Sequence, residues 1–236
     1  MKIVDMHCHI LPGVDDGAKN METSLAMLKA SEEQGVQYMV ATPHFYATRD
    51  RVDAFLDRRR EAWEALESRM DTDSPRIFLG AEVAFFQGIS RADQLDKLRI
   101  EGTNCMLLEM PFRPWSDADV DEVTQIYEKY GYTIILAHIE RYLGMQGNDG
   151  YIEDLLELPV LTQINAESLL DWRQRRKLIK MLRNGQVHLL GSDCHGIKHR
   201  APNLFEGREV LRKKMGAEIL DRIDRRSEEL LLNRLG

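Results

Sequence analysis

Histidine and carboxylate side chains recur at the downstream ends of successive apolar, strand-like runs of this sequence. Imidazole nitrogens and carboxylate oxygens are common protein ligands of divalent transition-metal ions. In parallel α/β folds, sites form beyond the carboxyl ends of the strands, so side chains far apart in sequence converge on one rim. The residues at these positions are His7, His9, His44, Glu82, Glu109, His138, Asp193 and His195.

Two pairs of these residues, His7 with His9 and Asp193 with His195, have i, i+2 spacing. Side chains alternate between the two faces of a strand, so both members of a pair point the same way and can bind one ion. A single pair could equally consist of surface or hydrogen-bonded histidines. Five of the seven histidines lie at predicted strand exits, however, and together they predict a metal site.

The two glutamates, Glu82 and Glu109, end runs that are otherwise apolar. A carboxylate there is costly unless it is paired, hydrogen-bonded or ligated. This cost favours metal ligands over the alternative, in which either glutamate starts an exposed loop. Arg141 lies three residues after His138, just beyond the predicted rim. A guanidinium group matches phosphate oxygens well, although a lone arginine is most often a surface residue.

A glycine-containing loop, residues 11–17, directly follows His9. Its glycines permit a tight turn around the adjacent Asp15 and Asp16. Adjacent aspartates usually belong to a solvated turn or a helix cap. Beside a metal site, one of them can bind the ion or orient a bound water.

A competing motif is the C-x5-R spacing of Cys194 and Arg200, which is typical of cysteine phosphatases. The intervening residues are not glycine-rich, and Ala201 replaces the usual hydroxyl residue after the arginine. His195 also fits the metal set. The thiolate mechanism is therefore the weaker interpretation.

Alternating strands and helices must position these residues. Helical periodicity follows the strand-like runs, a further strand is predicted at Val160–Asn165, and the last stretch, Asn203–Leu235, is mostly charged helix; the other helices are predicted over Glu22–Glu33, Val52–Leu66, Asp119–Tyr130 and Leu169–Leu182. Alternation implies a parallel sheet with right-handed crossovers. About seven such units favour an α/β barrel, closed or nearly closed, over an open sheet.

Composition restricts the class of protein further. The chain has 236 residues, is 43% hydrophobic and carries a formal net charge of -7, which argues against a nucleic-acid partner. We expect one domain over residues 1–236, with no membrane span and no signal peptide. Three cysteines without framework spacing are consistent with a reducing compartment, so a cytoplasmic location is expected.

The sequence resembles the PHP (polymerase and histidinol phosphatase) superfamily. More narrowly, it is similar to the manganese-dependent bacterial protein-tyrosine phosphatases of capsule or exopolysaccharide synthesis. Three stretches carry the resemblance, which runs from residue 1 to about residue 200: Asp5–Gly17, Ala41–His44 and Gly191–His195. The resemblance implies a distorted (β/α)7 barrel, TIM-barrel-like, with up to three divalent ions. Mn²⁺ is the expected ion, and Fe²⁺, Zn²⁺ or Co²⁺ are alternatives.

The resemblance also implies roles for individual residues. The first ion would be held by His7, His9, Glu82 and Asp193, the second by Glu82, Glu109 and His138, and the third by Asp16, His44 and His195. Arg141 would bind phosphate, and Glu109 and Asp16 would also take part in catalysis. The family often has proline where this chain has Ile139. Loss of that proline leaves the backbone ahead of Arg141 less restricted.

The implied reaction is hydrolysis of phosphotyrosine by a hydroxide that bridges two ions. His44, Asp16 and His199 are candidates for a general acid. The implied partner is the phosphorylated, tyrosine-rich tail of a bacterial tyrosine kinase. Phe45, Tyr46 and the segment Phe112–Trp115, with Trp115 foremost, are predicted to line the rim that receives it.

Two alternatives fit the same scaffold. A histidinol-phosphatase-like enzyme for small molecules would have the same metal site and different rim loops. A non-catalytic regulatory module would lack metal ligands, and none is missing from this sequence. The sequence does not indicate the oligomeric state.

Overall fold

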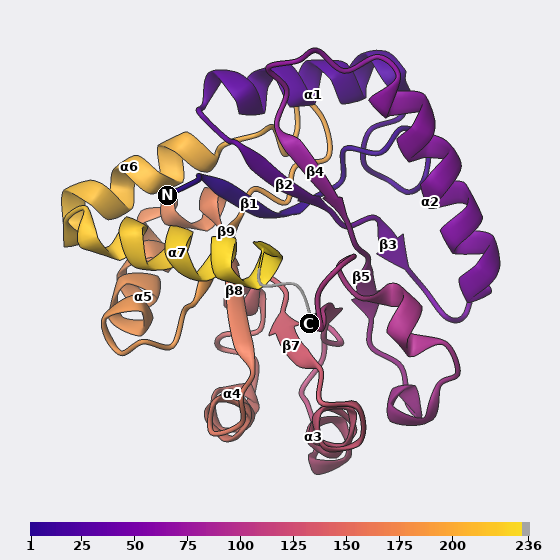
Figure 1. Ribbon diagram of the computed structural model, residues 1–236. Coiled ribbons are helices and arrows are strands. Elements are labelled where there is room, and N and C mark those ends of the chain that lie inside the picture. The colour runs from indigo at the N-terminus through magenta and orange to yellow at the C-terminus, as the bar shows by residue number, and fades with distance from the viewer. Residues whose placement is uncertain (233–236) are drawn as a thin grey trace.

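Nine short strands, all paired in parallel, form the centre of the structure, a computed structural model that describes residues 1–232 (Figure 1). They are β1 (Val4–Cys8), β2 (Tyr38–Ala41), β3 (His44–Phe45), β4 (Arg76–Leu79), β5 (Glu82–Ala84), β6 (Cys105–Glu109), β7 (Thr133–Leu136), β8 (Leu161–Asn165) and β9 (Leu189–Gly191). Their order is β1-β2-β4 in one sheet and β3-β5-β6-β7-β8-β9 in the other.

The two sheets form one curled layer, because β3 continues the line of β2 and β5 continues that of β4. Pro43 has no N–H for a sheet ladder and marks the first break. Hydrogen bonds from Gly80 N to Ala41 O (2.8 Å) and from Glu82 N to Pro43 O (3.1 Å) carry the ladder across both breaks. The nine strands therefore occupy seven positions. The predicted fold class, an α/β distorted barrel of seven units, is confirmed.

The first and last strands meet at the carboxyl end of the sheet. Asp193 N donates to His7 O at 2.8 Å, and His9 N donates to Cys194 O at 3.0 Å. The backbones of Cys8 and Cys194 form an isolated parallel β-bridge between the two segments. This contact brings residues from both ends of the chain to one rim.

Seven α-helices of the described residues surround the strands: α1 (Met21–Glu33), α2 (Val52–Glu67), α3 (Asp117–Tyr130), α4 (Asn148–Leu156), α5 (Trp172–Arg183), α6 (Leu204–Met215) and α7 (Glu218–Leu232). Short 3₁₀ turns cover Ile89–Arg91, Leu95–Leu98, Ile139–Arg141 and Ala166–Leu169. No helix within residues 1–232 is long and apolar enough to cross a bilayer.

Two predicted helices differ most from the structure, whereas the other three agree with it to within two residues at each end. The helix predicted from Leu169 begins at Trp172, because the side chain of Asp171 caps it and accepts from Arg173 N at 2.9 Å. The C-terminal stretch contains two helices, α6 and α7, separated at Gly216, whose φ of 88° favours glycine. The predicted end of this stretch, residues 233–235, lies outside the described residues.

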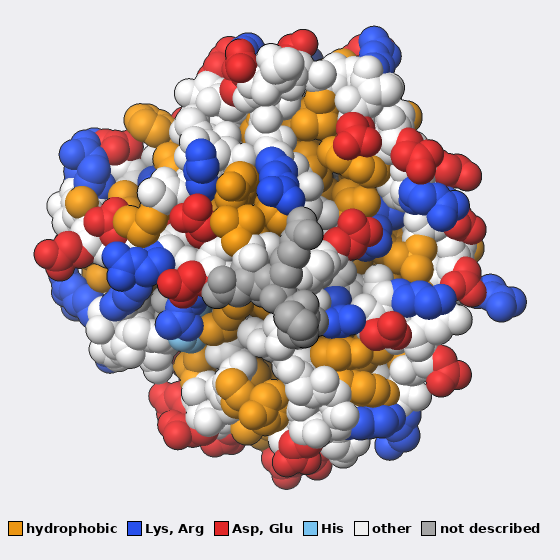
Figure 2. Space-filling view, viewed as in Figure 1, with side chains coloured by type: hydrophobic (Ala, Val, Ile, Leu, Met, Phe, Trp, Pro, Cys, Tyr) orange, Lys and Arg blue, Asp and Glu red, His pale blue; other side chains and the backbone are white. Residues whose placement is uncertain are grey.

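The side chains inside the barrel change character along the strands. An apolar cluster that includes Leu107, Leu161 and Leu189 fills the amino end, where Leu231 of α7 packs against it. Figure 2 shows this end, with α7 in front and almost no histidine on the surface. Farther along, the inward positions become polar, as at Glu109 after Leu107. The functional groups therefore gather at the carboxyl end.

Candidate metal centre

The nine predicted metal ligands converge at this carboxyl end. His7 Nε2 lies 3.0 Å from His9 Nε2 and 3.1 Å from Glu82 Oε2. Asp193 Oδ1 lies 3.6 Å from His7 Nε2 and 3.4 Å from His9 Nε2. Four side chains thus direct ligand atoms at one point, and they come from β1, the residue just after it, β5 and the segment after β9.

Glu82 lies at the middle of the centre. Its Oε2 is 3.3 Å from His9 Nε2 and 3.0 Å from His44 Nδ1, and its Oε1 is 2.8 Å from His138 Nε2. Burial opposes the ionisation of Glu82, but the surrounding histidines outweigh it and hold the pKa of the carboxyl well below its usual range. Glu109 Oε1 completes this side at 3.4 Å from His138 Nε2.

A third group of ligand atoms lies nearer the solvent. Asp16 Oδ1 is 3.6 Å from His44 Nε2 and 3.4 Å from His195 Nε2. Ligand atoms of His9, Asp16, His44 and His195 all lie within 4.8 Å of one another, so His9 faces this group as well as the first. The Asp16 side chain is 69% exposed, which leaves it accessible to a substrate.

Many of these atoms are close without being hydrogen-bonded. His44 Nδ1, Glu82 Oε2, Asp193 Oδ1 and His195 Nε2 are buried and have no hydrogen-bond partner among the described residues. A buried polar atom without a partner is destabilising, and such atoms are rare in folded proteins. Their common focus is explained if they bind cations, so the residues present fit a cluster of divalent ions.

Backbone irregularities aim several of these side chains. The register of β1 against β2 shifts between Asp5 and Cys8, so Met6 packs in the barrel interior while the next residue, His7, also turns toward the centre. His138 (φ 31°) and Asp193 (φ 52°) adopt the left-handed conformation. Non-glycine residues rarely adopt it, and they do so most often at functional sites.

Two further residues orient the histidines, and the sequence did not single them out for this role. Asp15 Oδ2 accepts from His9 Nδ1 at 2.7 Å and from His44 N at 2.8 Å. Gln163 Oε1 lies 3.2 Å from His7 Nδ1. Each contact places the proton on Nδ1 and leaves the Nε2 lone pair free for a metal, as is usual around metal-binding histidines. Asp15, rather than Asp16, is thus the supporting member of the aspartate pair.

Two arginines flank the centre. Arg141 Nη2 and Arg200 Nη2 each lie 2.5 Å from Asp193 Oδ2, which also accepts from Asn165 Nδ2 at 2.7 Å. Ile139 is fully buried, and the turn that it begins holds Arg141 at the rim without the family's proline. Both guanidinium groups remain about one-third exposed, so they can bind an anion. The sequence indicated Arg200 only as the arginine of the C-x5-R spacing, not as a residue of the metal centre.

The predicted rim aromatics separate into two groups. Tyr46 stacks on the His44 ring at 5.1 Å, so it lies at the centre. Phe45 alternates to the other face and packs against Phe55 in the core. Trp115 is 5% exposed, and its Nε1 donates to Pro111 O at 3.1 Å. Phe45 and Trp115 therefore offer no open surface to a peptide.

Phe112 is the exposed aromatic residue beside the site. Its side chain is 54% exposed, and its ring stacks on His138 (5.9 Å) and Tyr142 (5.3 Å). A substrate ring could extend this stack, and aromatic pairs contribute about 0.5–1.5 kcal/mol beyond area burial.

We expect Phe112→Leu to lower kcat/KM for a phosphotyrosine peptide about fivefold, within that energy range. Steady-state kinetics measures the effect, and Phe112→Tyr, which keeps a ring, should retain nearly full activity. Equal losses in the leucine and tyrosine variants would exclude a stacking role.

The cysteine motif does not form a second active site. Cys194 is fully buried, and burial raises the pKa of its thiol to about 12, so it is protonated at neutral pH. His195, which follows it, faces Asp16 in the metal centre. His199, one candidate for a general acid, is exposed.

Comparisons with known proteins agree with this geometry. The family model for capsular polysaccharide synthesis, CpsB/CapC, matches residues 3–233. The chain is 28% identical to the tyrosine-protein phosphatase YwqE of Bacillus subtilis, covering 98% of this chain and 92% of that protein. It is 31% identical to the putative tyrosine-protein phosphatase CapC of Staphylococcus aureus, covering 88% and 84%.

Solved structures show the same relationship. A chain from the crystal structures of YwqE from Bacillus subtilis and CpsB from Streptococcus pneumoniae, metal-dependent tyrosine phosphatases, superposes with a TM-score of 0.86 at 27% identity, covering 99% of this chain and 96% of that one. A phosphotriesterase homology protein from Escherichia coli shares the fold at a TM-score of 0.53 and 12% identity, covering 96% and 97%. This chain belongs to the CpsB/CapC family of capsular polysaccharide synthesis proteins.

Proposed function

We propose that this protein is a metal-dependent protein-tyrosine phosphatase. The observation that carries the proposal is the convergence of five histidines and four carboxylates on one rim, with buried ligand atoms that have no hydrogen-bond partner among residues 1–232. The similarity to tyrosine phosphatases along the full chain supports the same activity. No feature of the site favours a small-molecule phosphatase or a non-catalytic module over it.

We assign the residues to three ions from the distances between their ligand atoms. His7, His9, Glu82 and Asp193 would hold one ion, and Glu82, Glu109 and His138 a second, with Glu82 shared. Asp16, His44 and His195 would hold a third, with His9 beside them. Bound divalent ions lower the pKa of coordinated water and neutralise phosphate charge. We propose Mn²⁺ as the resident ion, a choice that the mixed nitrogen and oxygen ligands permit.

The chain's own residues bind and position the phosphate. Arg141 and Arg200 present two guanidinium groups on the same side of the centre, both directed at Asp193 Oδ2. Guanidinium forms paired hydrogen bonds with phosphate oxygens and stabilises the charge that develops on them during transfer. Asn165 holds Asp193 from behind, so the carboxylate keeps its place when an arginine turns to the substrate.

The leaving group fits a tyrosine ester. A phenol has a pKa near 10 and leaves with less protonation than an alkyl alcohol. Tyr46 and Phe112 border the centre and would contact the substrate ring. The phosphorylated tail of a bacterial tyrosine kinase is the substrate that we propose, and three buried, unpaired cysteines support a reducing, cytoplasmic setting.

Chelation tests the proposed function directly. Treatment with EDTA and removal of the chelator should reduce phosphotyrosine peptide turnover by at least about a hundredfold, since the metal supplies several kcal/mol of transition-state stabilisation. Adding Mn²⁺ should restore it, and titration with Fe²⁺, Co²⁺ and Zn²⁺ ranks the alternatives.

Cys194→Ser serves as the matched control for this experiment, and it should keep near wild-type, chelator-sensitive activity. Activity that survives chelation and disappears in Cys194→Ser would establish the thiolate route instead. A higher kcat/KM for histidinol phosphate than for phosphotyrosine peptide would favour the small-molecule enzyme.

A further inference from the structure

A strongly basic groove lies on the outside of the barrel, along α5 and against α6. Its volume is about 640 Å³, and seven of its nine lining residues are lysine or arginine, with no carboxylate among them. Lys214 belongs to α6, and the six cations of α5 are Arg173, Arg175, Arg176, Lys177, Lys180 and Arg183. The whole chain carries a net charge of -7, so this concentration of positive charge opposes its overall balance.

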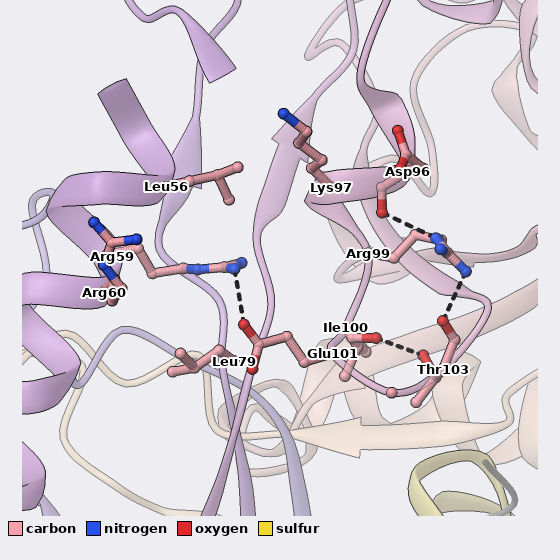
Figure 3. A pocket seen from close by; sticks show the side chains of 11 residues that line it. Leu56, Arg59, Arg60, Leu79, Asp96, Lys97, Arg99, Ile100, Glu101 and Thr103 are labelled. Carbon is pink, nitrogen blue, oxygen red and sulfur yellow. Dashed lines mark hydrogen bonds and ion pairs between the residues drawn. The ribbon is translucent and has the colours of Figure 1, made fainter. Parts of the chain in front are cut away.

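These cations are largely unpaired. Within residues 1–232, Lys177 is the one member of the set that forms an ion pair with a carboxylate, at 3.2 Å from Asp149. A second basic pocket, between α2 and residues 95–103, provides a contrast (Figure 3). There Arg59 pairs with Glu101 at 3.2 Å, and Lys97 pairs with Asp53 at 3.1 Å. The other six cations of the α5 groove form no ion pair within residues 1–232, so they can bind an external anion.

Part of the charge pattern of α5 works against the helix itself, although Asp171 caps its start and Lys180 and Arg183 suit the negative end of the helix dipole. The first turn of α5 contains no acidic residue but includes Arg173 and Arg175, at the end where the helix dipole is positive. Arg173 and Lys177, like Arg176 and Lys180, are spaced i, i+4, where like charges are destabilising. Helix formation therefore does not explain the cations of the first turn and the i, i+4 pairs, whereas an anionic partner would.

The groove starts on the segment that follows β8, at the carboxyl side of the barrel where the metal centre also lies. Asn165, at the end of β8, donates to Asp193 at 2.7 Å, and α5 starts seven residues later at Trp172. Trp172 is 69% exposed and lies under the Arg173 guanidinium, 5.4 Å from the ring centroid. From there α5 runs for 12 residues, or about 18 Å at 1.5 Å per residue, and Lys214 of α6 completes the groove. An extended peptide covers that length with about five or six residues.

We propose that this groove binds acidic or phosphorylated residues that flank the target phosphotyrosine in the protein substrate. The inference rests on the proposed phosphatase function and adds the class of substrate that is preferred. The groove supplies positive charge for the flanking carboxylates and phosphates, and Trp172 supplies a ring surface for a neighbouring side chain. A concave groove suits a peptide better than the flat surface of a bilayer.

Paired peptides test this proposal. One phosphotyrosine peptide carries glutamates on both sides of the target residue, and its partner carries glutamines at the same positions. We expect wild-type kcat/KM to be about tenfold higher for the acidic peptide at low salt, and the ratio to fall as NaCl screens the charges. The triple variant Arg173→Glu/Arg176→Glu/Lys180→Glu should lower the ratio to about one or below.

A control variant with the same charge change lies on the opposite side of the barrel. Lys29→Glu/Arg60→Glu/Arg69→Glu alters exposed cations of α1, of α2 and of the turn after α2, and it should keep the tenfold ratio. Turnover of p-nitrophenyl phosphate and of the glutamine peptide should be the same in all three proteins, which also shows that each is folded.

The outcomes separate the two proposals. A wild-type ratio near one, with the glutamine peptide still hydrolysed, would overturn the groove's role and leave the phosphatase function intact. Failure to hydrolyse either peptide would refute the phosphatase function itself. Sedimentation with phosphatidylcholine vesicles, with and without phosphatidylglycerol, covers the lipid alternative. A membrane-binding surface would be identified instead by two results together. The wild type would bind anionic vesicles and the α5 triple variant would not, and the ratio of kcat/KM for the acidic and glutamine peptides would be one.

Discussion

Replacing Glu82 by glutamine is expected to lower kcat for phosphotyrosine hydrolysis by at least about a thousandfold, or about 4 kcal/mol of transition-state stabilisation. The reason is the central position of this carboxylate, which lies within 3.3 Å of four histidines. The glutamine amide is neutral, so it cannot replace the carboxylate as an anionic metal ligand. Its NH₂ group would also face the imidazole nitrogens that are proposed to bind the metal. Loss of the shared ligand should therefore remove the cations of both inner groups.

The measurement combines steady-state kinetics with metal content per chain by atomic emission. We expect Glu82→Gln to lose metal and activity together, while Glu101→Gln, an exposed glutamate outside the site, changes neither. A Glu82→Gln protein with full metal content and near wild-type kcat would show that the centre of the cluster has been wrongly assigned.

Removing Arg141 should have the next largest effect. Arg141→Ala is expected to lower kcat/KM about a hundredfold, the typical effect of deleting one donor that stabilises transition-state charge. Metal content should be unchanged, because the Asp193 oxygen that faces His7 and His9 is Oδ1, whereas Arg141 contacts Oδ2. Arg141→Lys should recover part of the loss, since an ammonium group keeps the charge but lacks the planar fork.

Arg200 allows a comparison within the same site. Arg200→Ala should also reduce kcat/KM, and the double variant should be worse than either single one, because both guanidinium groups converge on Asp193 Oδ2. Lys198→Ala, an exposed cation of the same loop, serves as the control and should behave like the wild type. If Arg141→Ala lost metal as well as activity, its role would be to hold the centre together rather than to bind phosphate.

The positions of the proposed metal ligands could be predicted from the sequence because residue type and position coincide. A parallel α/β chain places the residues at the carboxyl ends of its strands on one rim, and this rule predicted that His7, Glu109 and Asp193 lie close together. The supporting residues lacked such a signal. Asp15 resembles any turn aspartate, and Gln163 lies within a strand, so their contacts with His9 and His7 depend on tertiary structure.

The rim aromatics show the same limit. Phe112 and Trp115 lie three residues apart in one loop, and nothing in their spacing indicates which is buried. The structure distinguishes them through the hydrogen bond from Trp115 Nε1 to Pro111 O. The sequence also did not predict the break at Pro43. There an apolar run that is typical of one strand divides into β2 and β3.

The contact between β1 and the segment after β9 has a consequence for synthesis of the chain. His7 and His9 leave the ribosome before Asp193, which follows 186 residues after His7, or roughly 10–40 s later at 5–20 residues per second. Until then His7 and His9 lack the carboxylate of Asp193 beside them, and the backbone hydrogen bond from Asp193 N to His7 O cannot form. Hydrolytic competence therefore cannot arise before β9 and Asp193 have been synthesised, and a nascent fragment that stops before β9 cannot dephosphorylate anything.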